Sequence, residues 1–170
     1  MADHRTSEAP DRRSGHPGTE VASPALLLNI ADLCCVSAGN SWALDRSIFK
    51  ACHRPTVWAG SRVISWFGDG PYGCNTEDGK RHLDCINAPN YTASIDTAVS
   101  LVPEGFYWHV GHGRTRDDEP LGGASVIAAG SLETISEAEA TTAALALCAA
   151  ALRARASNSP TPQTPSRTEG

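Results

Sequence analysis

The chain has 170 residues, which is enough for one domain with a hydrophobic core but short for two. Hydrophobic residues make up 41% and charged residues 19%, as in ordinary globular proteins, and a net charge of −5 with two lysines offers no basic face for binding phosphates. The longest apolar run, residues 143–152, is about half of the roughly 20 residues that a membrane-spanning helix needs. We therefore expect neither nucleic acid nor a membrane as a partner.

Both ends of the chain are polar. Residues 1–22 and 157–170 are rich in Pro, Ser, Gly and charged groups, and they hold too little apolar surface to offset the entropy of ordering. This composition predicts disordered tails, and the N-terminal stretch lacks the apolar segment of a secretory signal. We expect a bacterial cytoplasmic protein whose six cysteines are reduced: Cys34, Cys35, Cys52, Cys74, Cys85 and Cys148.

Two helices are predicted after the first tail. Ser23 and Pro24 form a typical helix start, and an apolar stripe follows at helical spacing: Leu27, Ile30, Leu33 and Cys34. The segment "SAGNS" interrupts this pattern. Ser41 is positioned to cap a second helix with Leu44, Ile48 and Cys52 on one side.

The region from His53 to Pro89 gives a weak pattern. "RVISWF" is typical of a strand, "GDGP" of a turn, and "YGCNTEDGKRHLDCINAP" is predicted to be loop. A short helix is predicted next, with Thr92 or Ser94 as its cap, Asp96 in its first turn and Pro103 after its end.

A hairpin and a final helix complete the predicted elements. In "GFYWHVGH" the side chains of Phe106, Trp108 and Val110 alternate with those of Tyr107 and His109, which predicts a strand with one apolar face. "GRTRDDEP" is predicted to be the hairpin tip and "GASVIAAG" the return strand. "SEAEATTAALALCAAALRARA" predicts the strongest helix, with Cys148 among the small side chains that face the sheet.

Few residues suggest metal or catalytic chemistry. His109 and His112 are three apart, so on a strand their side chains point to opposite faces. His82 and Cys85, with Cys74, have a spacing that could supply three metal ligands from one loop. No nucleophile elbow or phosphate-binding loop is present in the sequence. The positions of Asp45 and Asp96 suit helix starts, and we interpret both as structural.

Three segments resemble the phage ABA-sandwich domain family of phage and prophage proteins. They are "LDRSIFKACH", "YTASIDTAVSLVPEGFYWHV" and "ATTAALALCAAALRARA", and the resemblance covers residues 91–156 well and residues 32–53 in part. It implies an α-β-α layered domain and supplies no catalytic residues. The chain departs from the family pattern at Thr142, where a proline often opens the last helix, and in a divergent segment at residues 58–85.

The sequence thus predicts one small α/β domain, residues 23–156, with a short antiparallel sheet covered by helices. The first functional hypothesis is a non-enzymatic phage or prophage accessory protein that binds an unknown protein partner and needs no metal or cofactor. Its candidate binding residues are Tyr107, His109, His112 and Arg114. The alternative is a small metal-binding protein or hydrolase-like enzyme that uses the His82/Cys85 loop or the His109/His112 hairpin.

Overall fold

The prediction of a small mixed α/β domain with an antiparallel sheet is confirmed. The computed structural model describes residues 22–52, 55, 57–131 and 133–158, and in that part of the chain it contains four helices and two antiparallel sheets. The predicted tails fall almost entirely outside the described residues. The last helix nevertheless continues to Asn158, two residues past the predicted boundary.

The elements follow one another as two helices, a four-stranded sheet, a short helix, a three-stranded sheet and a final helix. In chain order they are α1 (Pro24–Val36), α2 (Trp42–Cys52), β1 (Val57–Trp58), β2 (Ser61–Phe67), β3 (Tyr72–Thr76), β4 (Arg81–Ile86), α3 (Ile95–Val99), β5 (Phe106–Arg114), β6 (Pro120–Ala128), β7 (Thr134–Ala140) and α4 (Ala143–Asn158). Each sheet is a simple meander, with the strands in the order β1-β2-β3-β4 in one and β5-β6-β7 in the other.

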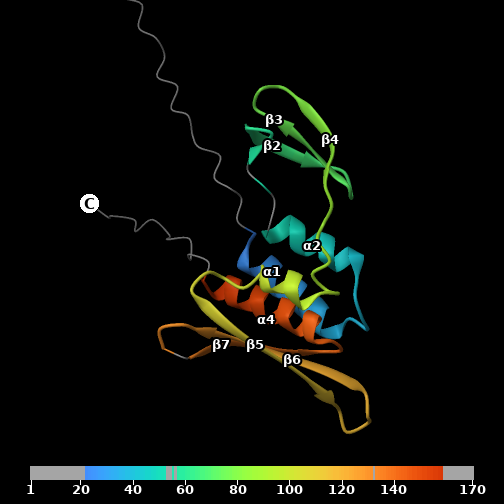
Figure 1. Cartoon of the computed structure of the whole chain (residues 1–170), viewed down its shortest axis with the longest axis vertical. Coiled ribbons are helices and arrows are strands. Elements are labelled where there is room, and N and C mark those ends of the chain that lie inside the picture. The colour runs from blue at the N-terminus through green and yellow to red at the C-terminus, as the bar shows by residue number, and fades with distance from the viewer. Residues whose placement is uncertain (1–21, 53–54, 56, 132, 159–170) are drawn as a thin grey trace, which may run out of the picture.

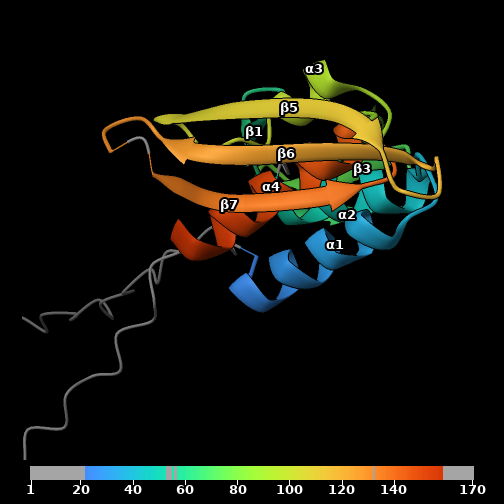
Figure 2. The same ribbon diagram turned by 90° about the horizontal axis from the view of Figure 1, so that it is seen from below.

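The helices lie between the two sheets. Figure 1 shows α4 resting on the β5–β7 sheet, with α1 and α2 beyond it and the β1–β4 sheet further out. In Figure 2 the same three strands lie in front of all four helices. Among the described elements, therefore, the helices cover one face of the β5–β7 sheet and leave its other face open.

The predicted helix starts are confirmed by their caps. The Oγ atoms of Ser23 and Ser41 accept hydrogen bonds from Leu26 N at 3.3 Å and Leu44 N at 3.4 Å. Ser94, one of the two predicted caps of α3, accepts from Thr97 N at 3.3 Å. These caps act within one turn of chain, which is why the sequence predicts them correctly.

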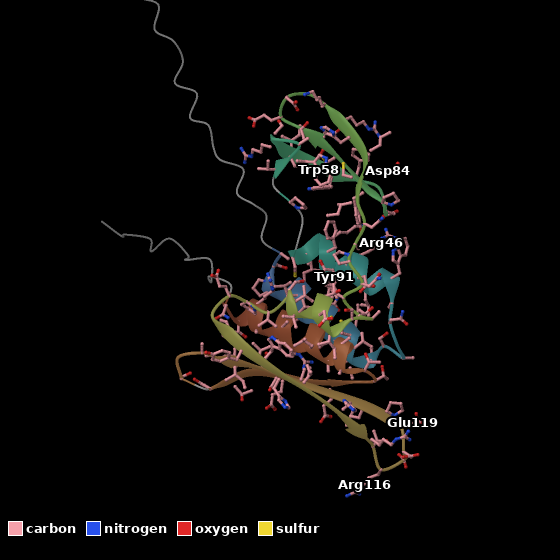
Figure 3. All side chains as sticks on the ribbon, in the orientation of Figure 1. Arg46, Trp58, Asp84, Tyr91, Arg116 and Glu119 are labelled. Atoms are coloured by element: carbon pink, nitrogen blue, oxygen red, sulfur yellow. The ribbon has the colours of Figure 1, made fainter. Side chains whose placement is uncertain are left out.

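The segment predicted to be loop after residue 71 is a β-hairpin, so that prediction was wrong. Strands β3 and β4 pair through Cys74 with His82 and Asn75 with Arg81, and Thr76 N donates to Lys80 O at 2.9 Å to close the turn. The small sheet that results lies apart from the helices in Figure 3, where Trp58 and Asp84 are labelled within it. No two-residue alternation marks these strands because an irregularity interrupts their pairing.

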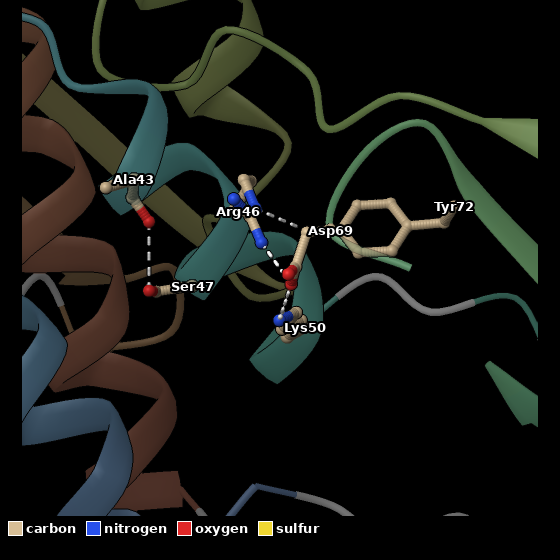
Figure 4. Close-up of polar contacts among 6 residues, drawn as sticks. All are labelled: Ala43, Arg46, Ser47, Lys50, Asp69 and Tyr72. Carbon is tan, nitrogen blue, oxygen red and sulfur yellow. Dashed lines mark hydrogen bonds and ion pairs between the residues drawn. The ribbon is translucent and has the colours of Figure 1, made fainter. Parts of the chain in front are cut away.

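Helix α2 holds this small sheet by one aromatic contact and one charged cluster. The rings of Phe49 and Tyr72 stack with centroids 5.1 Å apart, and both side chains are almost fully buried. Beside them Arg46 forms an ion pair with Asp69, and Lys50 Nζ lies 3.5 Å from an oxygen of the same carboxylate (Figure 4). Since Asp69 is largely exposed, the buried aromatic pair contributes more to the attachment than the ion pairs.

The second difference concerns the start of the last helix. Residues 136–140 were predicted to be helical but belong to β7, and α4 begins only at Ala143. Ala138 and Ala140 are buried against the core, whereas Glu137 and Glu139 are exposed, so a two-residue alternation is present. The helix is then capped by Thr142, whose Oγ1 accepts from Leu145 N at 3.2 Å.

Helix α4 is the centre of the core. Every residue from Leu145 to Leu152 is completely buried, because the sheet lies on one side of the helix and α1 and α3 lie on the other. Cys148 does not face the sheet as predicted, since its Sγ donates to Tyr91 O at 3.4 Å on the helical side. Among the described helices, none is long and apolar enough to span a membrane.

Candidate functional site

Strand β5 carries all four candidate binding residues, and its register decides where each one points. Phe106 and Val110 pack against the core, which places the even-numbered residues on the helical side of the sheet and the odd-numbered residues on its open face. Tyr107 is 60% exposed and Trp108 40% exposed. The predicted alternation is present, but Trp108 is less covered than expected because β5 is an edge strand.

The four candidates do not form one patch. Tyr107 and His109 belong to the open face, while His112 and Arg114 belong to the opposite face by the same alternation. Arg114 is also engaged at the hairpin tip, where its Nη1 lies 2.7 Å from both the backbone oxygen and the carboxylate of Asp118. The tip itself, with Arg116 and Glu119, projects well beyond the helices in Figure 3.

The backbone of β5 has a free edge. Gly105 O accepts from Ala129 N at 3.3 Å, and Thr115 N donates to Glu119 O at 2.9 Å, so the odd-numbered residues are those that bond to β6. The N–H and C=O groups of the even-numbered residues from Phe106 to His112 therefore point away from the sheet. No hydrogen bond within the described part of the chain satisfies them.

The other edge of the sheet is covered at one position. Glu137 on β7 points its backbone carbonyl outward, and Arg153 Nη1 donates to that oxygen at 2.8 Å. Asp32 on α1 holds the same guanidinium through a contact of 3.0 Å between Arg153 Nη2 and Asp32 Oδ1. Proteins commonly protect edge strands by covering them, so β5 is the more open of the two edges of this sheet.

The open face is shallow and polar. A depression of about 590 Å³ lies over its centre, lined in part by His109, Ser125, Glu137 and Glu139. His109 and Glu137 flank Ser125 on the neighbouring strands. In a hydrolytic triad the histidine stands between the serine and the acid, so this order differs from a triad.

Asp45 is a buried structural acid, as the sequence indicated. Its carboxylate, 3% exposed, accepts a hydrogen bond from Thr92 N at 2.7 Å and so joins α2 to the segment that precedes α3. Burial raises the pKa of Asp45, and the hydrogen bonds from Thr92 act in the opposite direction. The net effect favours the protonated form of the carboxyl group in the folded protein.

We expect Asp45 to make stability depend on pH. Because its pKa is higher in the folded than in the unfolded state, the folded state binds more protons, and its contribution to the free energy of unfolding falls as pH rises through the folded pKa. In Asp45→Asn this contribution is absent, so the stability of wild type relative to Asp45→Asn should decrease between pH 3 and pH 7 (about the range in which carboxyl groups titrate). Urea unfolding at several pH values measures the difference.

A second variant separates charge from hydrogen bonding. Asp45→Ala also lacks the titrating group, but it leaves the buried Thr92 N–H without its acceptor, which should cost about 1–3 kcal/mol at every pH. A stability difference between wild type and Asp45→Asn that does not change with pH would contradict the role of burial.

The predicted metal ligands come together only in part. Cys74 and Cys85 lie with their Sγ atoms 3.8 Å apart. No group of three or more His, Cys, Asp or Glu side chains among the described residues is arranged to hold a metal ion. The structure therefore does not bring His82 into a three-ligand site with the two thiols. The sequence groups both cysteines with His82 as possible ligands. It does not predict the direct contact between the two thiols, because that contact depends on a strand irregularity that leaves no periodic signal.

No protein-family model, curated protein or solved structure is significantly similar to this chain.

Proposed function

We propose that this chain is a non-enzymatic binding protein that acts through protein–protein contacts at the free edge of β5. The observation that carries the proposal is the row of outward N–H and C=O groups from Phe106 to His112, which lack hydrogen-bond partners within the described residues. An exposed edge of this kind pairs with an extended strand of another chain. The resemblance to phage ABA-sandwich proteins supports an accessory role in phage or prophage biology, in the cytoplasm of a bacterial host.

The occupant that β5 fits best is a second copy of the same strand. Its N-terminal half carries bulky side chains and its C-terminal half carries Gly111 and Gly113. Antiparallel pairing about Val110 sets Tyr107 opposite Gly113 of the second copy and His109 opposite Gly111. A Cβ atom at Gly113 would meet nothing within 4 Å, so the Tyr107 ring has room to cover that position.

The hydrogen-bonding pattern agrees with this register. Pairing about Val110 matches even-numbered residues with even-numbered residues, and these are the residues whose backbone groups point outward. The product would be a six-stranded sheet in which the β5 edge of each copy is paired with the β5 edge of the other. No specific observation favours the alternative of a metal-dependent or hydrolase-like enzyme, since His109 and His112 point to opposite faces.

The test of this proposal is the oligomeric state of two variants at one position. His112 is exposed and its N–H points outward, so His112→Pro removes an intermolecular donor while keeping the ladder to β6 intact. We expect wild type to show a concentration-dependent dimer by analytical ultracentrifugation. His112→Pro should be monomeric over the same range and have an unchanged circular dichroism spectrum.

His112→Ala is the matched control, because it removes the imidazole and retains the N–H. It should dimerise about as well as wild type. If wild type is monomeric at all concentrations, self-pairing is wrong, and a photo-crosslinking residue at position 107 then reports whether a strand of another protein occupies the edge. Absence of both the dimer and any crosslink would reject β5 as the binding site.

A further inference from the structure

The hairpin of β3 and β4 contains an irregularity in strand pairing next to its two cysteines, Cys74 and Cys85. Tyr72 pairs with Ile86 and Cys74 pairs with His82, so two steps along β3 correspond to four steps along β4. Within the extra segment Asp84 adopts a left-handed conformation, with φ of 50°, which is unfavourable for a residue with a side chain. A bulge of this kind changes the direction of the side chains that follow it, and the next residue is Cys85.

The bulge brings the two thiols into contact. The Sγ atoms of Cys74 and Cys85 are 3.8 Å apart, within a distance that side-chain rotation can close to a covalent bond. Cys74 is completely buried, whereas Cys85 is partly exposed. The Cys85 thiol is therefore accessible to a reagent in solution, whereas the Cys74 thiol is not.

Two cysteines of the helical core are less accessible than Cys85. Cys34 and Cys148 are completely buried, and burial raises the pKa of Cys34 to about 12 and raises that of Cys148 further. Burial also raises the pKa of Cys74 to about 11, with a smaller contribution from its neighbour Cys85. A protonated thiol is a weak nucleophile, so these buried groups should not react first with an external oxidant.

We infer that Cys74 and Cys85 form a thiol–disulfide site that is oxidised by small disulfides of the oxidised-glutathione class. The Cys85 thiol loses its proton to solvent and its sulfur attacks one sulfur of oxidised glutathione, which releases one glutathione thiolate and leaves a mixed disulfide on Cys85. The Cys74 sulfur, after losing its proton, then attacks the Cys85 sulfur and displaces the second glutathione. The two cysteines are oxidised, and two molecules of reduced glutathione are formed.

The new bond would lock a hairpin that has little core of its own. Among the described strands of this sheet, most side chains are partly or fully exposed, and the buried ones gather on β3, where Tyr72 contacts α2. A crosslink between β3 and β4 restricts opening of the hairpin. Amide hydrogen exchange in residues 72–86 should be slower in the oxidised protein than in the reduced protein.

The test uses the full chain equilibrated with oxidised glutathione, followed by alkylation and tryptic digestion. Trypsin cleaves after Lys80 and Arg81, so the two cysteines fall on different peptides that only the new disulfide joins. We expect one crosslinked peptide pair, loss of two alkylatable thiols per chain, and full reversal by dithiothreitol. Cys35→Ser removes another partly exposed thiol and should leave this result unchanged.

Two serine variants test the order of the steps. Cys74→Ser should retain glutathione as a stable adduct on Cys85, because the second thiol is missing. Cys85→Ser should carry no adduct on the buried Cys74. A wild-type product that keeps glutathione on Cys85, a crosslink through a different cysteine, or a Cys74→Ser variant without adduct would each overturn the inference.

Discussion

Replacing Gly122 by alanine should destabilise the protein by about 3 kcal/mol or more, a large fraction of the stability of a typical domain. A Cβ atom at this position would lie 2.2 Å from the carbonyl carbon of Thr142 and 2.3 Å from Ala143 N. Both are backbone atoms at the start of α4, so relief requires the helix to move away from β6. Urea unfolding followed by circular dichroism measures the loss.

The neighbouring residue is a matched control. Gly123 faces the other side of the same strand, and a Cβ atom there would meet nothing within 4 Å. Gly123→Ala should be neutral or stabilise the protein by up to about 1 kcal/mol, because it reduces the freedom of the unfolded chain. Similar stabilities for the two variants would mean that α4 does not lie against β6 at Gly122.

The sequence predicts the helices of this protein because their signals are local. Ser23 with Pro24, and Ser41, mark the starts of α1 and α2 within a single turn. The β5–β6 hairpin is predicted for the same reason, since its apolar alternation and its polar tip are contiguous. In each case the signal comes from residues that are close in sequence, so it can be recognised without knowledge of the tertiary structure.

Strand β7 shows where local signals fail. Glu137, Ala138, Glu139 and Ala140 are good helix formers and precede a long run of alanine and leucine. Pairing with β6 overrides this preference: Ala138 lies opposite Ala124, and Ala140 opposite Gly122. The alternation of exposed and buried residues could have been noticed, but it covers too few residues to outweigh the helical composition.

The sequence predicts that the four candidate residues lie on or next to one strand and groups them as one candidate site, but they point to opposite faces of the sheet. The predicted alternation sets Tyr107 on the side of β5 away from Phe106 and Val110, and Tyr107 is exposed. The strand order makes β5 an edge strand. Arg153, about 40 residues away in sequence, covers part of the opposite edge. Strand order is a tertiary property, so β5 alone does not reveal that its outward backbone groups are free.

Cys148→Arg should prevent the protein from folding. Cys148 is completely buried in the middle of α4, and its nearest polar partner is the backbone carbonyl of Tyr91. A guanidinium at this site would lie near the buried Cys34 and the partly buried Cys52, with Asp45 as the nearby acid. Asp45 already accepts a hydrogen bond from Thr92 N, and burial raises its pKa, so ionising it as a counter-charge carries a desolvation cost.

An insufficiently paired buried charge costs about 3–5 kcal/mol, and the bulk of arginine in a fully packed helix adds to that cost. Leu33→Arg on α1 is the control, because Leu33 is 46% exposed and its substitution should change stability by less than about 1 kcal/mol. Thermal unfolding and near-ultraviolet circular dichroism compare the two variants. A cooperative transition for Cys148→Arg within a few degrees of wild type would place this face of α4 in solvent, and α4 would then cease to be the element that joins the helices to the sheet.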